Sequence, residues 1–272
     1  MVWRGSDTKV LVTAGLLTGL VATGAFGFLS MAVAVAVATV TVVCAVTIVV
    51  RVALREVLNA EQHSRVQQQA AAGLYAVLTP RLPLPLMLGW SATPELSLQI
   101  TSLILGRNVQ HVFEAGSGVS TLIAGYALAK ASREQARVTS LDHDAGYAEI
   151  TRAQLAEHGF REGLRVLHAP LVEHQIRGGS WQWYDLSKLP DGPPIDLLVV
   201  DGPAVKTQPM ARYPALPLLF SRLSPDAVVV LDDAARDSER AVVARWLAEY
   251  PGQFEHHYLE TAKGVSILKR IG

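Results

Sequence analysis

Residues 113–121 read Phe113-Glu-Ala-Gly-Ser-Gly-Val-Ser-Thr121 and decide the fold. The apolar stretch Val109–Glu114 is predicted to be a strand, and Ser120–Ala131 is predicted to be a helix. Two glycines between a strand and a helix let the backbone approach a ligand closely, and Ser120 and Thr121 are suited to capping the helix. A ligand is expected at this turn, although any tight strand-to-helix turn also uses glycine.

The same alternation of strand and helix continues to the end of the chain. Further strands are predicted at Arg137–Asp142, Leu164–His168, Ile195–Asp201 and Ala227–Asp232, and further helices at Tyr147–His158, Tyr213–Leu223 and Glu239–Tyr250. Two closing strands, Phe254–Glu260 and Val265–Arg270, are joined by a short turn, which indicates an antiparallel hairpin. This pattern predicts an α/β fold with a mostly parallel, seven-stranded sheet covered on both faces.

Upstream of residue 109 the composition changes twice. A helix is predicted at Pro94–Gly106, and the three prolines of Pro80-Arg-Leu-Pro-Leu-Pro85 predict a linker, because proline cannot continue a helix. The stretch Arg51–Leu78 has helical composition. The predicted organisation is therefore residues 1–50 as a membrane anchor, 51–89 as a stalk helix with its linker, and 90–272 as the α/β domain.

The anchor is predicted from a stretch without charge. From Val10 to Val50 there is no Asp, Glu, Lys, Arg or His, and one span needs about 20 residues. Two spans, Val10–Ala25 and Met31–Val50, fit this length, with the glycines and serine of Gly24–Ser30 as the turn. A signal peptide has a shorter apolar region, a buried helix pair is a second alternative, and Met31-Ala-Val-Ala-Val alternates as a strand would. The unbroken length favours membrane helices.

Charge sets the expected orientation and excludes several classes of protein. Basic residues stand on both sides of the apolar stretch, at Arg4, Lys9, Arg51 and Arg55, which predicts a hairpin with both ends in the cytoplasm. Lys+Arg 24 against Asp+Glu 24 argues against a nucleic-acid binder, and 50% hydrophobic residues exclude disorder. The single cysteine, Cys44, excludes a disulfide framework and a cysteine-based zinc site, and we expect it to be an inert side chain in lipid.

Acidic residues end the predicted strands, where ligands bind in sheets of this kind. Asp142 ends the second strand and can accept both hydroxyls of a ribose; the alternative is a helix N-cap. The turn is not a dinucleotide fingerprint, because Thr121 stands where the third glycine is needed and Glu114 would repel a pyrophosphate. Neither a phosphate-binding Gly-x-x-x-x-Gly-Lys nor a Gly-x-Ser-x-Gly elbow is present.

Four motifs in this order resemble those of the class I S-adenosylmethionine-dependent methyltransferases, in particular the family-24, catechol and macrolide-sugar O-methyltransferases. The motifs are Phe113–Thr121, Ser140-Leu-Asp142-His-Asp144 with Tyr147, Asp196–Pro203, and Val228–Asp233. The resemblance covers about Trp90 to Gly272 and leaves the anchor outside. It implies a Rossmann-like methyltransferase fold, here preceded by transmembrane helices, and S-adenosyl-L-methionine as the cofactor.

The resemblance also implies which residues bind that cofactor. A cofactor with an ammonium and a sulfonium group suits a cleft that carries carboxylates. The implied contacts are Glu114 with the methionine amino group, Gly116 and Gly118 with the cofactor through their backbone, Ser120 with the carboxylate, Asp142 with the ribose, and His143 and His168-Ala169 with the adenine.

Three carboxylates match the metal ligands of the metal-dependent members of this set. Asp201, Asp232 and Asp233 end two strands that are expected to be neighbours, and oxygen ligands suit Mg²⁺ or another divalent cation. The alternative is that they cap turns or orient the acceptor without a metal. Pro203 departs from the catechol-type pattern, whose catalytic lysine would stand at position 204, and Lys206 is out of register.

The predicted catalytic residues are Asp201, Asp233 and His168, the last because the pKa of histidine lies near neutrality. A structural or adenine-side contact is the alternative for His168. The aromatic run Trp181–Tyr184 either walls the acceptor pocket or packs the sheet. Arg212 and Arg236 stand where acceptor contacts usually fall.

The leading hypothesis is a membrane-anchored methyltransferase acting on oxygen, with or without a divalent cation, on a small-molecule or lipid-linked acceptor. Its catalytic domain is expected on the cytoplasmic side of a bacterial-type inner or plasma membrane, without nucleic acid as a partner. One alternative is an aminopropyltransferase-like or dehydrogenase-like enzyme. Another is a non-catalytic membrane-associated nucleotide-binding or scaffold protein that keeps the fold.

Overall fold

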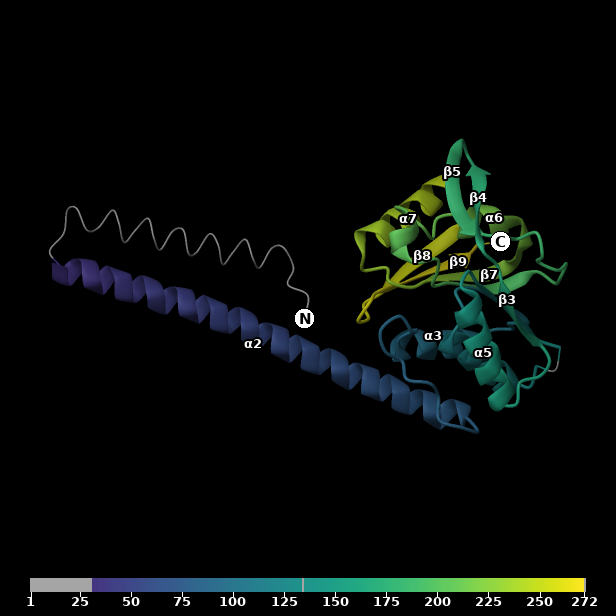
Figure 1. The fold of residues 1–272 in the computed structure, drawn as a ribbon, viewed down its shortest axis with the longest axis horizontal. Helices are drawn as coiled ribbons and strands as arrows, with labels where there is room; N and C mark the ends of the chain where they lie inside the picture. Colours follow the sequence, from purple (N-terminus) through teal and green to yellow (C-terminus); the bar gives the residue numbers. More distant parts are fainter. Residues whose placement is uncertain (1–30, 134, 272) are drawn as a thin grey trace. The chain divides into compact units, whose positions relative to one another are not determined.

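The computed structural model describes residues 31–133 and 135–271 of the chain. Contacts between Cα atoms divide the chain into two units, Met1–Arg65 and Val66–Gly272. The helix α2, Met31–Leu78, belongs to both, because its last turns are part of the second unit (Figure 1). The predicted boundaries at residues 50 and 89 remain predictions, and the boundary found by contacts falls inside the predicted stalk.

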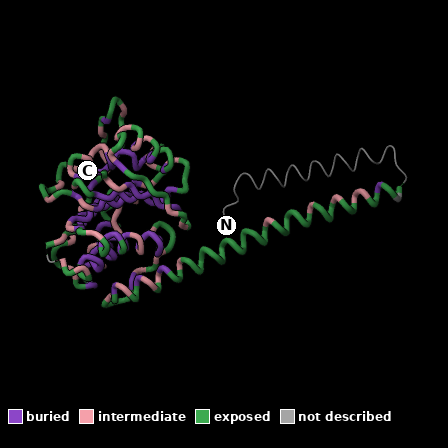
Figure 2. Tube along the Cα trace, turned by 180° about the vertical axis from the view of Figure 1, so that it is seen from behind, coloured by how far each residue is buried: buried purple, intermediate pink, exposed green. Residues whose placement is uncertain are grey.

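α2 is the one helix in the described part of the chain that is long and apolar enough to cross a membrane. Figure 2 shows it exposed along most of its length. The hydroxyls of Thr39, Thr41 and Thr47 donate to backbone carbonyls one turn earlier, at 2.7–2.8 Å, so they need no partner outside the helix. The second predicted span and the predicted stalk helix lie in one continuous helix, α2, and their place in and beside a membrane remains a prediction. The first, Val10–Ala25, lies outside the described residues.

The last turns of α2 are held in the core of the second unit. Leu74 and Leu78 are fully or almost fully buried there, one turn apart on the same face. Pro80 then ends the helix. The linker that follows is fixed by two tyrosine hydroxyls: Tyr75 accepts from the backbone N–H of Leu84, and Tyr126 accepts from that of Arg81, both at 3.0 Å.

The second unit is built on a seven-stranded sheet with the strand order β3-β2-β1-β6-β7-β9-β8. β9 is antiparallel to both β7 and β8, and the other neighbours are parallel. The strands of this sheet are β1 His111–Ala115, β2 Arg137–Asp142, β3 Leu164–His168, β6 Ile195–Val200, β7 Leu223–Leu231, β8 Phe254–Leu259 and β9 Val265–Arg270. The predicted mostly parallel sheet with its closing hairpin is confirmed.

Helices cover both faces of this sheet, and each face has its own apolar core. Figure 1 shows α3 and α5 on one side, and α6 and α7 on the other. The helices are α3 Pro94–Gly106, α4 Val119–Lys130, α5 Ala145–Glu157, α6 Ala215–Leu219 and α7 Asp237–Glu249, with short 3-10 turns η1 Val205–Thr207 and η2 Phe220–Arg222. Predicted and observed helices agree, except that the predicted Tyr213–Leu223 is split into α6 and η2.

A second, two-stranded sheet was not predicted. β4, Leu171–Ile176, and β5, Gly179–Tyr184, form an antiparallel hairpin between β3 and β6. Its turn residues Arg177 and Gly178 both have positive φ, 49° and 79°, which is the geometry of a tight primed turn. Arg-Gly is a weaker hairpin signal than Asn-Gly or Asp-Gly, and this is why the segment was interpreted as a connection.

Candidate active site

The chain order places a switch point between β1 and β6. From β1 the chain moves outward to β2 and β3, and it returns to β6 on the other side of β1. Ligands in such sheets bind at the carboxyl ends of the strands beside this point. The turns that leave β1 and β6 there cross closely, because the backbone N–H of Asp201 donates to the carbonyl of Ala115 at 2.9 Å.

Gly116 is required at this crossing. Its φ is +105°, and a Cβ atom there would lie 3.2 Å from the carbonyl oxygen of Asp201 and 3.3 Å from the nitrogen of Gly202. Its backbone N–H donates to the carbonyl of Leu141 at 2.9 Å. A side chain at position 116 would therefore be strained by the backbone conformation and would press on the turn that follows β6.

Glu114 lies beneath the turn. It is 1% exposed, and its Oε2 accepts from the hydroxyls of Thr121, at 2.6 Å, and Ser140. Burial raises the pKa of its carboxyl, and these hydroxyl donors oppose the shift. Glu114 thus ties β1, β2 and the start of α4 together, and its contact with a cofactor amino group remains a prediction.

Asp142, at the end of β2, is held by its neighbours. Its Oδ2 accepts from the hydroxyl of Ser117 at 2.7 Å, and its Oδ1 accepts from the backbone N–H of Asp144 at 3.0 Å. The helix cap of α5 is Asp144, whose Oδ1 accepts from the N–H groups of Gly146 and Tyr147; the latter bond lowers its pKa most. Since Asp144 performs the capping, the alternative reading of Asp142 as the cap does not hold.

A cavity of about 500 Å³ opens at the carboxyl ends of β1, β2 and β6. Among the residues that line it are seven predicted site residues: Gly116, Gly118, Ser120, Asp142, His143, Asp201 and Asp233. Glu114 and Asp232 are buried behind it. The strand ends thus bring most of the predicted cofactor residues to one place.

The structure argues against His168 as a general base. His168 is exposed at the end of the edge strand β3, three strands away from β6, and it does not line the cavity. Strands lie about 4.8 Å apart, which separates its backbone from that of Asp201 by about 14 Å. Ala169 is buried, and its N–H donates to the carbonyl of Asp142 at 2.7 Å, so it extends the pairing of β3 with the end of β2.

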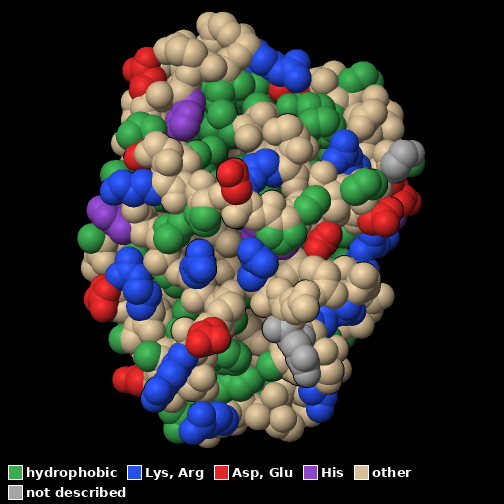
Figure 3. Space-filling model, turned by 90° about the vertical axis from the view of Figure 1, so that its right-hand side faces the viewer, with side chains coloured by type: hydrophobic (Ala, Val, Ile, Leu, Met, Phe, Trp, Pro, Cys, Tyr) green, Lys and Arg blue, Asp and Glu red, His purple; other side chains and the backbone are tan. Residues whose placement is uncertain are grey.

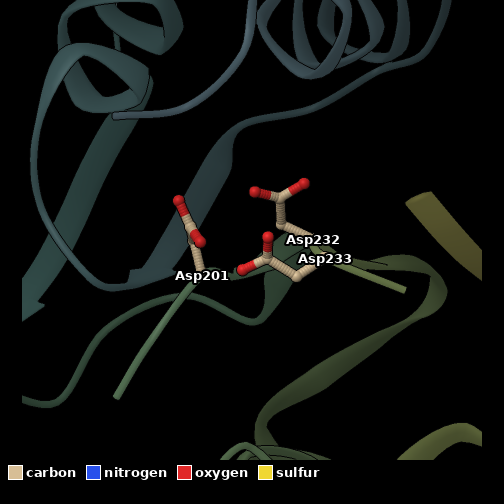
Figure 4. Close-up of side chains that lie close together, drawn as sticks. All are labelled: Asp201, Asp232 and Asp233. Carbon is tan, nitrogen blue, oxygen red and sulfur yellow. The ribbon is translucent and has the colours of Figure 1, made fainter. Parts of the chain in front are cut away.

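Asp201, Asp232 and Asp233 converge from the ends of β6 and β7 (Figure 4). Each offers one carboxylate oxygen within 4.8 Å of the others. Asp233 adopts a left-handed backbone conformation, with φ of +56°, which turns its side chain back toward Asp201. The predicted convergence of the three carboxylates is present.

Arg212 lies among these carboxylates, and the sequence analysis did not predict this. It is 3% exposed, and its Nη2 donates to Asp201 Oδ1 at 3.0 Å and to Asp233 Oδ2 at 2.7 Å. Its Nη1 donates to the carbonyl of Asp232 at 2.8 Å, and a fourth carboxylate, Glu239, lies 4.0 Å from its Nε. One guanidinium therefore contacts the ends of both strands.

The segment that carries Arg212 is fixed by packing. The next residue, Tyr213, is fully buried, and its carbonyl accepts from the indole N–H of Trp246 at 2.8 Å. Arg236 adds a second cation at the edge, 2.8 Å from Asp233 Oδ2. Nothing in the sequence pairs Arg212 with these carboxylates, because it lies 11 positions after Asp201 and 21 positions before Asp233. Arg236 is only three residues from Asp233, and that pair was not predicted either.

The cluster holds more negative than positive charge. Burial raises the pKa of Asp201 well above its usual range, and repulsion from Asp232 raises it further, while Arg212 opposes the shift. Burial also raises the pKa of Asp232, followed by repulsion from Asp233. Both oxygens of Asp232 and Oδ1 of Asp233 are buried and accept no hydrogen bond from any described residue. Buried carboxylate oxygens without a hydrogen-bond donor would be stabilised by a bound proton or cation.

Tyr184 is a further lining residue that the sequence analysis left open. It ends β5, is 1% exposed, and lines the cavity. Its hydroxyl lies so close to Gly202 that a Cβ there would come within 2.2 Å of it. Trp183 is fully buried in the core, so the aromatic run does both: one member packs the sheet and the other reaches the cavity.

Comparison with known proteins agrees with this architecture. Residues 113–234 match the family model of a methyltransferase domain. No curated protein matches the chain. These residues include the turn after β1, the ends of β2 and β6, and the Asp232-Asp233 pair.

Several solved structures share the fold at low sequence identity. The methyltransferase PaMTH1 of Podospora anserina, bound to SAH, is 15% identical, with a TM-score of 0.53 over 79% of this chain and 96% of that one. A putative O-methyltransferase from Klebsiella pneumoniae is 17% identical, with a TM-score of 0.54 over 76% and 100%. The O-methyltransferase from Bacillus cereus, in complex with SAH, is 16% identical, with a TM-score of 0.53 over 77% and 99%.

Proposed function

We propose that this chain, an S-adenosylmethionine-dependent methyltransferase by its methyltransferase domain and its fold, transfers the methyl group to a hydroxyl oxygen of its acceptor. The observation that carries this proposal is that one cavity is lined both by Gly116 and Asp142, after β1 and at the end of β2, and by Asp201 and Asp233, after β6 and β7. The first pair suits a nucleoside with a charged tail, and the second suits a hydroxyl that must lose a proton. Two of the solved structures that share the fold are described as O-methyltransferases, which supports transfer to oxygen.

The cofactor would lie along the ends of β1 and β2. Asp142 would accept the ribose hydroxyls, because its carboxylate has more lone pairs than Ser117 and Asp144 occupy. Gly116 and Gly118 would leave room for the methionine part, Ser120 would face its carboxylate, and His143 would flank the adenine.

The chemistry combines a methyl transfer with a proton transfer. The acceptor oxygen would form a bond to the methyl carbon, while the carbon–sulfur bond of the sulfonium breaks and sulfur keeps the electron pair. The hydroxyl proton would pass to a carboxylate. Asp201 and Asp233 are the candidate bases because both line the cavity, and the raised pKa of Asp201 suits a group that must accept a proton near neutrality.

The three-aspartate cluster also suits a divalent cation. Both carboxylate oxygens of Asp232 lack a donor, and Arg212 donates to only one carboxylate oxygen each of Asp201 and Asp233. Carboxylate oxygens are the ligands that Mg²⁺ and Mn²⁺ prefer. A cation held there would lower the pKa of the acceptor hydroxyl and so assist its deprotonation.

Two measurements test the proposal. Titration calorimetry of the full-length protein in detergent should show binding of S-adenosylmethionine, and incubation with a methyl-labelled donor and membrane extract should yield a product with the label on oxygen. No binding of the donor would overturn the proposal and favour a non-catalytic protein with this fold. A label found on nitrogen would overturn transfer to oxygen alone.

Asp142→Ala is expected to weaken donor binding while the domain stays folded. Each charge-assisted hydrogen bond that the variant loses costs about 1.5–3 kcal/mol, which corresponds to at least about 10-fold in the dissociation constant. Calorimetry on both proteins measures this. Asp226→Ala, which removes an exposed carboxylate, is the control and should leave affinity unchanged. Equal affinities of the wild type and Asp142→Ala would remove Asp142 from the site.

We propose further that the protein is anchored in a membrane as a two-span hairpin, with its catalytic unit in the cytoplasm. The apolar helix α2 and the satisfied hydroxyls of its threonines support one span. The basic residues on both sides of the uncharged stretch Val10–Val50 are the argument for the hairpin. Reporters fused before Met1 and after Gly272 are both expected to report the cytoplasm. A C-terminus accessible from outside would contradict the hairpin and would separate the enzyme from its cytosolic donor.

A further inference from the structure

The mouth of the cavity carries exposed apolar side chains. Five of its lining residues are large and apolar and lie open to solvent: Leu86 is 80% exposed, Trp90 73%, Tyr147 61%, Ile150 53% and Val205 37%. They come from three segments far apart in the sequence, the linker before α3, the first turns of α5, and the turn after β6. Exposed apolar groups gathered on one rim mark a site of interaction.

The segment of the rim that carries Leu86 and Trp90 is held in place by hydrogen bonds and packing. The ammonium of Lys263 donates to the carbonyls of Gly89 and Ser91, at 3.3 and 3.1 Å, and holds the linker against the β8–β9 turn. Thr93 caps α3 by accepting from the N–H of Leu96, and Leu84 is buried in the core. Leu86 and Trp90 are therefore exposed on a fixed loop. Figure 3 shows one face of the molecule, on which apolar side chains are interspersed with charged ones.

The position of the rim restricts what can cover it. The exposed rim residues line the same cavity as Asp142, Asp201 and Asp233, at its opening to solvent. A protein seated on all three segments would close that opening. A lipid bilayer would cover the same side chains and would itself contain the acceptor. Exposed Lys206 and Arg236 stand at the mouth and suit anionic headgroups, although Asp144 carries the opposite charge there.

We propose that the rim formed by Leu86, Trp90, Tyr147, Ile150 and Val205 docks on a lipid bilayer, so that the acceptor is a hydroxyl-bearing amphiphile of that membrane. The identity of the acceptor rests on the proposed function, and docking on the bilayer does not. α2 supplies an independent reason for lipid as the partner, because the same chain carries an apolar helix of membrane-spanning length. Aromatic side chains such as Trp90 and Tyr147 are suited to the headgroup region.

Quenching of tryptophan emission tests the docking without any methyl transfer. The full-length protein is reconstituted in vesicles of phosphatidylcholine and phosphatidylglycerol, with or without bromine on the acyl chains. The chain has five tryptophans, so the signal of Trp90 is taken as the difference between the wild type and Trp90→Phe. We expect brominated lipid to remove most of this difference signal, and iodide in the water to affect it little.

A matched control places a tryptophan away from the mouth. Leu105 is 37% exposed near the end of α3, just before β1 begins, and so lies at the opposite edge of the sheet from the carboxyl ends. Leu105→Trp in the Trp90→Phe background should be quenched by iodide and not by brominated lipid. A Trp90 signal that iodide quenches and brominated lipid does not would overturn the docking. In that case the acceptor would reach the cavity from water.

The same preparations separate this proposal from the proposed function. Lipid quenching of Trp90 in a protein that fails to bind S-adenosylmethionine would uphold the docking and refute the enzyme. Donor binding without lipid quenching would refute the docking and uphold the enzyme.

Discussion

Arg212→Met is expected to lower the free energy of unfolding of the catalytic unit by about 3–5 kcal/mol, because removing one partner of a buried ion pair leaves the other charge uncompensated. The guanidinium contacts Asp201, Asp233 and the carbonyl of Asp232, and it is 3% exposed. Methionine fills similar volume without the charge. Chemical denaturation in detergent, followed by tryptophan emission, measures the loss.

A second arginine gives the control for this experiment. Arg240 pairs with Asp237 on the surface of α7, where both side chains are exposed. Such pairs contribute about 0–1 kcal/mol, so Arg240→Met should change stability little. Arg212→Lys keeps the charge but loses the forked geometry, so its free energy of unfolding should lie between those of Arg212→Met and Arg240→Met. If Arg212→Met were as stable as Arg240→Met, the cluster would not depend on Arg212.

The loss in Arg212→Met should depend on pH. Burial raises the folded-state pKa of Asp201 and Asp232, and Arg212 opposes both shifts, so removing Arg212 raises these pKa values further. A carboxyl whose pKa is raised on folding contributes stability below its unfolded pKa and loses it as pH rises through its folded pKa. The variant should therefore lose more stability at pH 8 than at pH 5. An equal loss at both values would mean that the destabilisation comes from packing.

The fold could be predicted from the sequence because its signals are local. Several strands of the main sheet contain short apolar runs, such as Ile195–Val200 of β6, and β2, β6 and β7 end at or directly before an acidic residue. Thr93-Pro94 marks the start of α3, because threonine caps and proline suits the first helical position. The parallel order followed from the alternation with helices. The hairpin β4–β5 was missed because no helix separates its two strands and because Arg177-Gly178 is a weak turn signal.

The site could be predicted only as far as strand ends determine it. Asp142, Asp201 and Asp233 are placed by the sheet, since the carboxyl ends of parallel strands meet at one edge. Arg212 comes from an irregular segment between η1 and α6, and no periodicity relates it to the aspartates. His168 also ends a strand, but the strand order puts β3 at the edge, and that order is a tertiary property.

Excess chelator is expected to abolish methyl transfer, and Mg²⁺ or Mn²⁺ is expected to restore it. The three aspartates repel one another, and Arg212 compensates only part of their charge. A cation that binds the folded state alone should also raise the melting temperature; at a concentration 100 times its dissociation constant it contributes about 2.7 kcal/mol. Thermal unfolding with and without the ion measures this in the absence of any acceptor.

Asp232→Asn decides between a cation and a proton at this site. Asp232 is 1% exposed, does not line the cavity, and has two oxygens without a donor. If these oxygens bind a cation, the amide removes a charged ligand, and the variant should lose the thermal shift with Mg²⁺ and the activity while donor binding changes little. If Asp232 instead carries a proton, which its raised pKa also favours, the neutral amide replaces a neutral acid and the variant should keep its stability and activity. Full activity of the wild type in excess chelator would refute the cation. Asp201 and Asp233 would then orient and deprotonate the acceptor beside Arg212, because His168 lies outside the cavity.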